Sequence, residues 1–206
     1  MNGPQLILAS ASPRRRDLLA QIGLGFTALT VEADETPRPG ESPARYVRRV
    51  AAEKSLLGQR AGTTGLPVLG ADTEVVLDGK VFGKPHDFSH AQEMLRSLSG
   101  RDHQVMSAVS LRVGDRHWEA LSISKVVFRA ITEAEIEAYW ASGEPRDKAG
   151  AYAIQGLGAV FVSRLEGSFS GVMGLPLFET AGLLREAGVW QPLFDQADQA
   201  IVLNGG

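Results

Sequence analysis

The sequence predicts an α/β fold in which a mixed sheet is flanked by helices and two lobes lie around a cleft. Segments with strand-like and helix-like periodicity alternate along the chain, as they do in α/β proteins. Two long strand-like segments, 103–113 and 117–129, follow one another around Gly114-Asp115, which argues against a purely parallel sheet. The 206 residues are 44% hydrophobic and 22% charged, which is enough to bury a core without disulfides. We expect one domain over 1–189 and a loosely held tail over 190–206.

The first part of the chain alternates short apolar runs with amphipathic segments. The run from Leu6 to Ala9 is typical of a buried strand, and Gly23 ends the helix that follows it. An acidic, proline-rich loop precedes a long helix that has Pro43 in its first turn. The expected elements are a strand at 5–9, a helix at 13–22, a strand at 26–31 and a helix from Ser42 to about residue 60.

Turn signals divide the remainder of the chain. A strand over 68–77 is expected to be interrupted at 70–73, because small residues and a carboxylate break its apolar run. Asp78-Gly79 then predicts a hairpin turn, and Thr132 predicts a helix N-cap. Besides the two long strands, the expected elements are a helix at 88–98, a helix at 133–140, a strand within 156–164 and a helix from Pro176 to Ala187.

The composition excludes several classes of protein. The chain contains no cysteine, which removes disulfides, thiolate nucleophiles and zinc ribbons and is typical of a reducing cytoplasm. No signal peptide is evident, and no apolar run approaches the roughly 18 residues of a membrane span. The formal net charge is −3, whereas proteins that grip nucleic-acid backbones are usually basic. We expect a cytoplasmic location and neither a membrane nor a nucleic-acid partner.

The first helix begins with an unusual charge pattern. Ser12 is a good N-cap and Pro13 suits the first helical position, but the first turn then holds Arg14, Arg15 and Arg16. Acidic residues are favoured there, because a helix N-terminus carries partial positive charge. The arrangement is explained if an anion binds between the backbone N–H groups and the guanidinium groups. The alternative is a solvated basic turn.

A carboxylate inside an apolar strand is the second candidate feature. Asp72 follows Gly70 and Ala71, which remove bulk and allow another group to approach the backbone. A carboxylate in such a position is costly unless it is paired or binds metal. Asp72 is therefore a candidate general base or magnesium ligand, with an aspartate that caps a turn as the alternative.

Other polar residues are weaker candidates when taken alone. Lys84 lies in a rigid Gly-Lys-Pro turn and could reach a phosphate as a point charge, although turn lysines are usually solvated. Lys54, late on the second helix, is ambiguous in the same way. Glu35 lies in the loop after the second strand. Gln155 could present an amide that donates to and accepts from a nucleobase edge.

Five motifs, in order along the chain, resemble the Maf family of nucleoside triphosphate pyrophosphatases from about residue 5 to about residue 186. Each motif is weak alone, but their shared order is specific. The motifs are Ser10-Ala11-Ser12-Pro13-Arg14-Arg15-Arg16, Gly70-Ala71-Asp72-Thr73, Gly83-Lys84-Pro85, Asp147-Lys148-Ala149-Gly150 with Ile154-Gln155-Gly156, and Gly174-Leu175-Pro176-Leu177.

The resemblance implies a fold related to the inosine triphosphate pyrophosphatases and a reaction that releases pyrophosphate from a nucleoside triphosphate. It implies a divalent metal, Mg²⁺ with Mn²⁺ as the alternative, and makes a homodimer plausible. Asp72 matches the family's catalytic acid/base position and, with Glu35, would hold the metal. The positions that match phosphate and metal handling are Ser10, Arg14, Glu35, Lys54 and Lys84.

Three residues match family positions that are associated with substrate choice: Arg14, Thr73 and Gln155. Their combination is similar to that of the branch that acts on dTTP and UTP. Two alternatives stay open at this stage. One is a pyrophosphatase for 7-methyl-GTP or another modified nucleotide, and the other is a non-enzymatic regulator of cell division.

Overall fold

The computed structural model describes residues 3–191, and within them one seven-stranded mixed sheet organises the chain. The strands are β1 (Leu6–Ala9), β2 (Phe26–Leu29), β3 (Val68–Leu77), β4 (Lys80–Phe82), β5 (Asp102–Val113), β6 (Arg116–Phe128) and β7 (Val162–Glu166). Their order is β2-β1-β3-β5-β6-β7, with β4 paired to β3. Strand β1 is parallel to both β2 and β3, whereas β3, β5, β6 and β7 are antiparallel neighbours. The predicted mixed α/β sheet is thereby confirmed.

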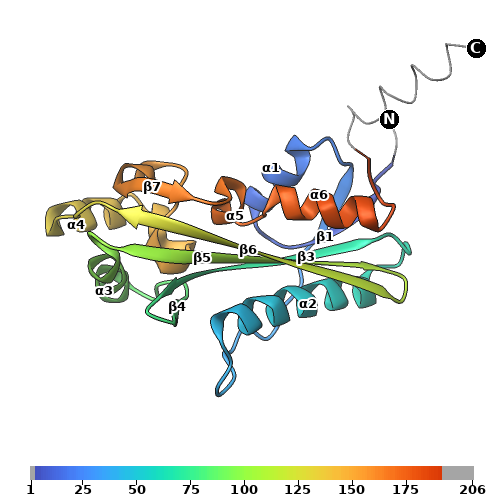
Figure 1. Ribbon diagram of the computed structural model, residues 1–206, viewed down its shortest axis with the longest axis horizontal. Helices are drawn as coiled ribbons and strands as arrows, with labels where there is room; N and C mark the ends of the chain where they lie inside the picture. The colour runs from blue at the N-terminus through green and yellow to red at the C-terminus, as the bar shows by residue number, and fades with distance from the viewer. Residues whose placement is uncertain (1–2, 192–206) are drawn as a thin grey trace, which may run out of the picture.

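Helices cover both faces of this sheet. They are α1 (Pro13–Gln21), α2 (Pro43–Ala61), α3 (Phe88–Leu98), α4 (Glu133–Ala141), α5 (Phe169–Met173) and α6 (Leu177–Glu186), with 3₁₀ turns η1 (Glu144–Asp147), η2 (Ala149–Ala151) and η3 (Leu157–Phe161). Figure 1 shows α2 on one face and α1, α5 and α6 on the other, while α3 and α4 lie together at one end of the long strands. Within residues 3–191, no helix has the length and apolar character needed to cross a membrane.

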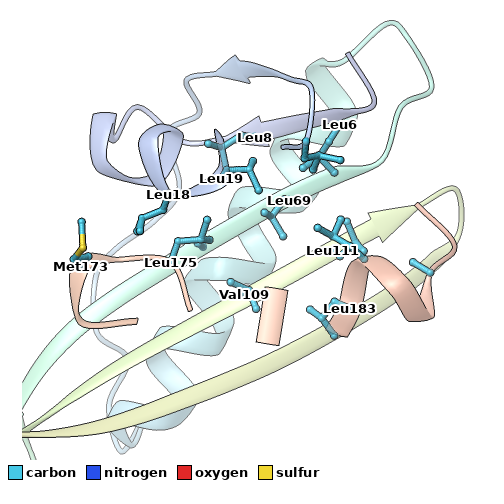
Figure 2. Close-up of a cluster of buried hydrophobic side chains, with 14 of the residues drawn as sticks. Leu6, Leu8, Leu18, Leu19, Leu69, Val109, Leu111, Met173, Leu175 and Leu183 are labelled. Atoms are coloured by element: carbon cyan, nitrogen blue, oxygen red, sulfur yellow. The ribbon is translucent and has the colours of Figure 1, made fainter. Parts of the chain in front are cut away.

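The hydrophobic core has two main clusters, one toward each end of the long strands. The first joins β1, α1 and α6 to the sheet through leucines such as Leu8, Leu18 and Leu69, which lie together in Figure 2. The second joins α3 and α4 to the sheet around Phe128 and Tyr139. Partly buried residues that pack against both clusters connect them: Val162, Leu165 and Val172. The proposed boundary at residue 189 stays a prediction, since 192–206 lie outside the described residues.

Three sequence expectations need correction. Strand β3 runs without interruption through Gly70–Thr73, because these residues pair in register with β5. The segment from Gly156 begins as η3, and the strand starts only at Val162. Ser12 occupies the N-cap position of α1, but its side chain makes no capping hydrogen bond. Helix α5 was not predicted because it has only five residues, too few to show a helical period.

Other local predictions are confirmed. The side chains of Ser42 and Thr132 accept N-cap hydrogen bonds, and Thr132 forms a full capping box with Glu135. Asp78 and Gly79 both adopt positive φ in the β3–β4 hairpin, as a two-residue turn of this type requires.

The expected start of the loose tail at Trp190 is wrong, because Trp190 packs against the first core cluster.

The close approach of α2 to β3 depends on Gly70. A Cβ at this position would lie 2.4 Å from the carbonyl oxygen of Ala51 and 2.5 Å from the nitrogen of Ser55, both backbone atoms of α2. Backbone atoms cannot move aside as a flexible side chain can, so only glycine allows this contact. The expectation that Gly70 admits another group to the strand is confirmed, and that group is a helix backbone.

We expect Gly70→Ala to lower the free energy of unfolding by about 1–3 kcal/mol, because the added methyl overpacks the α2–β3 contact. Urea denaturation of the variant measures this change. Gly182→Ala is the matched control. Gly182 lies inside α6, and a Cβ added there would meet no atom within 4 Å. That substitution should stabilise the chain by about 0.5–1 kcal/mol. Equal effects of the two substitutions would contradict the packing argument.

Candidate active site

A cleft of about 1060 Å³ opens above the central strands. Segments far apart in sequence line it: the β1–α1 turn, α2, the middle of β3, the β4–α3 connection, residues 147–155 and the end of α5. All eight residues selected from the sequence line this one cleft: Ser10, Arg14, Glu35, Lys54, Asp72, Thr73, Lys84 and Gln155. Their common location agrees with a shared site, while their individual roles stay predictions.

Lys54 bridges two carboxylates at the floor of the cleft. Its Nζ lies 2.8 Å from Asp72 Oδ1 and 2.7 Å from Glu35 Oε1. The side chains of Lys54 and Asp72 are only 11% and 6% exposed, so this pair is largely removed from water. Attraction between opposite charges is stronger in such surroundings than at the surface, although burying the charges is itself costly.

The loop that carries Glu35 is tied to α2. The Tyr46 hydroxyl donates to the carbonyl oxygen of Glu35 at 2.8 Å. Arg49 donates to the carbonyl oxygens of Asp34 and Thr36 on either side of it, at 2.9 and 3.0 Å. Burial acts to raise the pKa of Glu35, but the hydrogen bond and charge of Lys54 hold that pKa below its ordinary value. Helix α2 therefore supplies both the cation and the supports of its carboxylate partner.

Arg15 is a site residue that the sequence analysis did not select individually. Its guanidinium donates to the Gly174 carbonyl oxygen at 2.8 Å, to Ser10 Oγ at 3.3 Å and to Thr73 Oγ1 at 3.4 Å. Burial lowers the pKa of Arg15, and the charge of Asp72 opposes this shift. Arg15 therefore connects the β1–α1 turn, β3 and the end of α5. The sequence of three arginines indicated a cationic turn but not which of them points inward.

Glu74 is the second residue missed. It lies two positions after Asp72 on β3, so both side chains are on the same face of the strand. Burial raises the pKa of Glu74 to about 8, and the charges of Asp72 and Glu35 act in the same direction. Asp72 Oδ2 and Glu74 Oε2 are both buried and accept no hydrogen bond from the described residues. The sequence analysis missed Glu74 because it expected β3 to be interrupted at 70–73, so it did not place residues 72 and 74 on one face of a continuous strand.

The remaining candidates line the walls of the cleft. Lys84 is held there because the N–H of Gly150, in η2, donates to the carbonyl oxygen of Gly83 at 3.0 Å. The charge of Lys84 acts to lower the pKa of both Glu35 and Glu74. Arg14 adds positive charge, whereas the charge of Lys148 is paired with that of Asp147, and Gln155 has an exposed side chain. Within residues 3–191, neither Arg14 nor Gln155 forms a side-chain hydrogen bond or ion pair, which leaves both free to contact a ligand.

The fold and the cleft define a mixed-sheet α/β protein whose ligand site combines several cations with buried carboxylates. The chain also matches the model of the family described as Maf-like protein over residues 5–187. It belongs to that family.

Relatives at high identity support the assignment to the family. The chain is 64% identical, over 90% of its length and 92% of the relative's, to a protein from Methylococcus capsulatus named dTTP/UTP pyrophosphatase. A protein of the same name from Bordetella avium is 55% identical, over 92% of this chain and 98% of the relative. The solved structure of the Staphylococcus aureus Ham1 protein aligns with a TM-score of 0.45 and 13% identity, covering 60% of this chain and 71% of that one.

The raised pKa of Glu74 predicts a pH-dependent contribution to stability. Its pKa rises from 4.5 to about 8 on folding, so the folded chain holds this proton more tightly than the unfolded chain. Stability from this group is complete below pH 4.5 and is lost as the pH rises through about 8. Glutamine does not titrate, so Glu74→Gln does not lose this stability. As the pH rises from 4.5 to about 8, we expect the free energy of unfolding of the variant to gain on the order of 3 kcal/mol relative to that of the wild type.

Urea denaturation from pH 5 to about 9, in buffer free of divalent cations, measures this difference. Glu137→Gln, an exposed change of the same kind on α4, is the matched control. Parallel stability curves for wild type and Glu74→Gln would show that Glu74 does not titrate in this range.

Proposed function

We propose that this chain hydrolyses nucleoside triphosphates to the monophosphate and pyrophosphate, with dTTP and UTP as its preferred substrates. The observation that carries the proposal is the name dTTP/UTP pyrophosphatase of relatives up to 64% identical over most of both chains. The cleft agrees with it, because about 1060 Å³ accommodates a nucleotide and its walls are rich in cations.

The cations of the cleft are suited to bind the triphosphate. Lys54 and Lys84 are ammonium point charges, whereas Arg14 offers a planar fork that matches phosphate oxygens. Three N–H groups of Arg15 bond to Gly174, Ser10 and Thr73, so it shapes the site and adds positive charge to it. Fixed cations stabilise the charge that develops on the phosphates and on the departing pyrophosphate.

Asp72 is the proposed general base. One oxygen is engaged by Lys54, and the other, Oδ2, is buried without a partner among the described residues. It would accept a proton from a water whose oxygen attacks the α-phosphorus. The new bond forms between this oxygen and the phosphorus, while the bond to the bridging oxygen of the β-phosphate breaks. Pyrophosphate leaves and the monophosphate remains.

A divalent cation fits the donors of the site. Mg²⁺ prefers oxygen ligands and is usually held by one or two carboxylates together with substrate phosphates. Asp72 and Glu74 offer buried carboxylate oxygens without partners, and Glu35 lies across Lys54 from Asp72. Within residues 3–191, no group of three or more His, Cys, Asp or Glu side chains could hold a metal ion, so substrate phosphates would have to supply the remaining ligands. When bound, the cation would neutralise phosphate charge and polarise the phosphoryl oxygens.

Base choice is assigned to Gln155. Its amide can donate to O4 and accept from N3–H of uracil or thymine, a pattern that cytosine reverses. Arg14 and Thr73 are proposed to contribute from the same cleft. The homodimer, the cytoplasmic location and the absence of nucleic-acid binding stay predictions from the sequence.

Pyrophosphate release from dTTP, UTP, CTP, GTP, 7-methyl-GTP and ITP with Mg²⁺ tests the function. We expect dTTP and UTP to be preferred and Asp72→Asn to lower turnover about 10²–10⁴-fold without unfolding the chain. Preference for a purine would keep the reaction and refute the role of Gln155. No release from any nucleotide would favour the regulator alternative. A variant that keeps more than about a tenth of the activity would remove Asp72 from the base role.

Chelation tests the metal. We expect EDTA to abolish pyrophosphate release, and Mg²⁺ in excess of the chelator to restore it, because phosphate neutralisation by the cation is part of the proposed chemistry. The measurement is the initial rate with UTP before chelation, after chelation and after readdition, with Mn²⁺ as a parallel series. Full activity in EDTA would show that the cations of the chain suffice.

A further inference from the structure

A carboxylate outside the cleft holds the loop that carries Gln155. Glu144, the first residue of η1, accepts the backbone N–H of Leu157 at Oε2 (2.8 Å) and that of Gly158 at Oε1 (3.0 Å). The Tyr139 hydroxyl donates to the same Oε1 at 2.8 Å. Burial acts to raise the pKa of Glu144, but these three hydrogen bonds hold it below its ordinary value. The carboxylate is therefore charged, which strengthens each bond it accepts.

Tyr139 extends this contact to the other side of Gln155. Its hydroxyl oxygen accepts the backbone N–H of Ala153 at 3.0 Å while its proton goes to Glu144. The loop is thus fixed two residues before Gln155 and two and three residues after it. Tyr139 is itself anchored on α4, and its ring packs edge-on against Phe161 at 5.1 Å between centroids. We call Glu144 and Tyr139 the loop clamp.

Two glycines allow the loop to reach the clamp. Gly156 has a φ of 110°, and a Cβ there would lie 2.4 Å from Glu144 Oε2. A Cβ at Gly158 would lie 2.6 Å from both the Tyr139 hydroxyl and the Ala153 carbonyl oxygen. The backbone therefore approaches both clamp residues as closely as only glycine permits. These close approaches place the loop backbone directly against Glu144 and Tyr139.

Neither clamp side chain lines the cleft, whereas Gln155 and its neighbour Ile154 do. An amide that must donate and accept at one base edge needs its backbone held closely, because displacements of about 1 Å can cost on the order of 10²-fold in rate. We propose that the loop clamp is a specificity device: Glu144 and Tyr139 are positioning residues that fix Gln155 for recognition of the uracil or thymine edge. This inference rests on the proposed function and goes beyond it.

The test compares kcat/KM for UTP, for CTP and for ribose 5-triphosphate, which has no base for Gln155 to contact. We expect Glu144→Gln to lower kcat/KM for UTP about 10- to 100-fold, mainly through KM. The NH₂ group of the glutamine is a donor, so it cannot accept the loop N–H group that the carboxylate oxygen bound. Activity on ribose 5-triphosphate should be unchanged, and the preference for UTP over CTP should fall with the UTP rate. Glu137→Gln, exposed on α4, is the matched control and should change none of these values.

Two further variants make the test decisive. Tyr139→Phe keeps the ring and removes both hydroxyl hydrogen bonds, so it should give the same pattern even where Glu144→Gln folds poorly. In a Gln155→Ala background, which itself loses the UTP preference, Glu144→Gln should have no additional effect on that preference.

Equal losses on all three substrates, or additive losses in the Gln155→Ala background, would overturn the clamp and leave a purely structural role. Failure of the proposed function is distinguishable, because it is read from the wild-type chain alone. A wild type that hydrolyses none of the substrates, or shows no preference for UTP, would refute the function and this inference with it.

Discussion

The contact of helix α2 with strand β3 at Gly70 is the constraint on which the site depends. Because Gly70 has no side chain, the helix backbone lies against the strand at Ala51 and Ser55. Lys54, which lies between these two residues in sequence, reaches Asp72 at 2.8 Å. The same helix supports the Glu35 loop through Tyr46 and Arg49. A change of helix position would therefore disturb a cation, its two carboxylates and a loop together.

The site is an arrangement of buried charges that compensate one another only in part. Lys54 is shared between Asp72 and Glu35, while Glu74 is buried beside them and has a raised pKa. Buried groups of this kind cost stability, and active sites are where such costs are concentrated. A polyanion with its cation would complete the arrangement by engaging both the free carboxylate oxygens and the cations of the walls.

In the proposed function, catalysis and specificity depend on different parts of the fold. The charged floor stands on β3 and α2, packed against the hydrophobic core, whereas Gln155 lies in a loop with little regular structure. Loops need support if they are to place a side chain reproducibly. Here Tyr139 supplies this support from helix α4, and Glu144 supplies it from turn η1.

The sequence by itself determined the fold class, most element positions and eight of the residues that line the cleft, because apolar periodicity, turn residues and ordered motifs are local features. It also indicated, through Gly70, where a second segment approaches β3. Only the tertiary structure decided that Lys54 joins Asp72 to Glu35, that Arg15 turns inward and that Glu74 shares the face of Asp72. It alone showed that Tyr139 binds the loop backbone before Gln155 and that Glu144 binds it after Gln155. These contacts depend on packing between segments distant along the chain, and local patterns carry no record of which side chains such packing brings together.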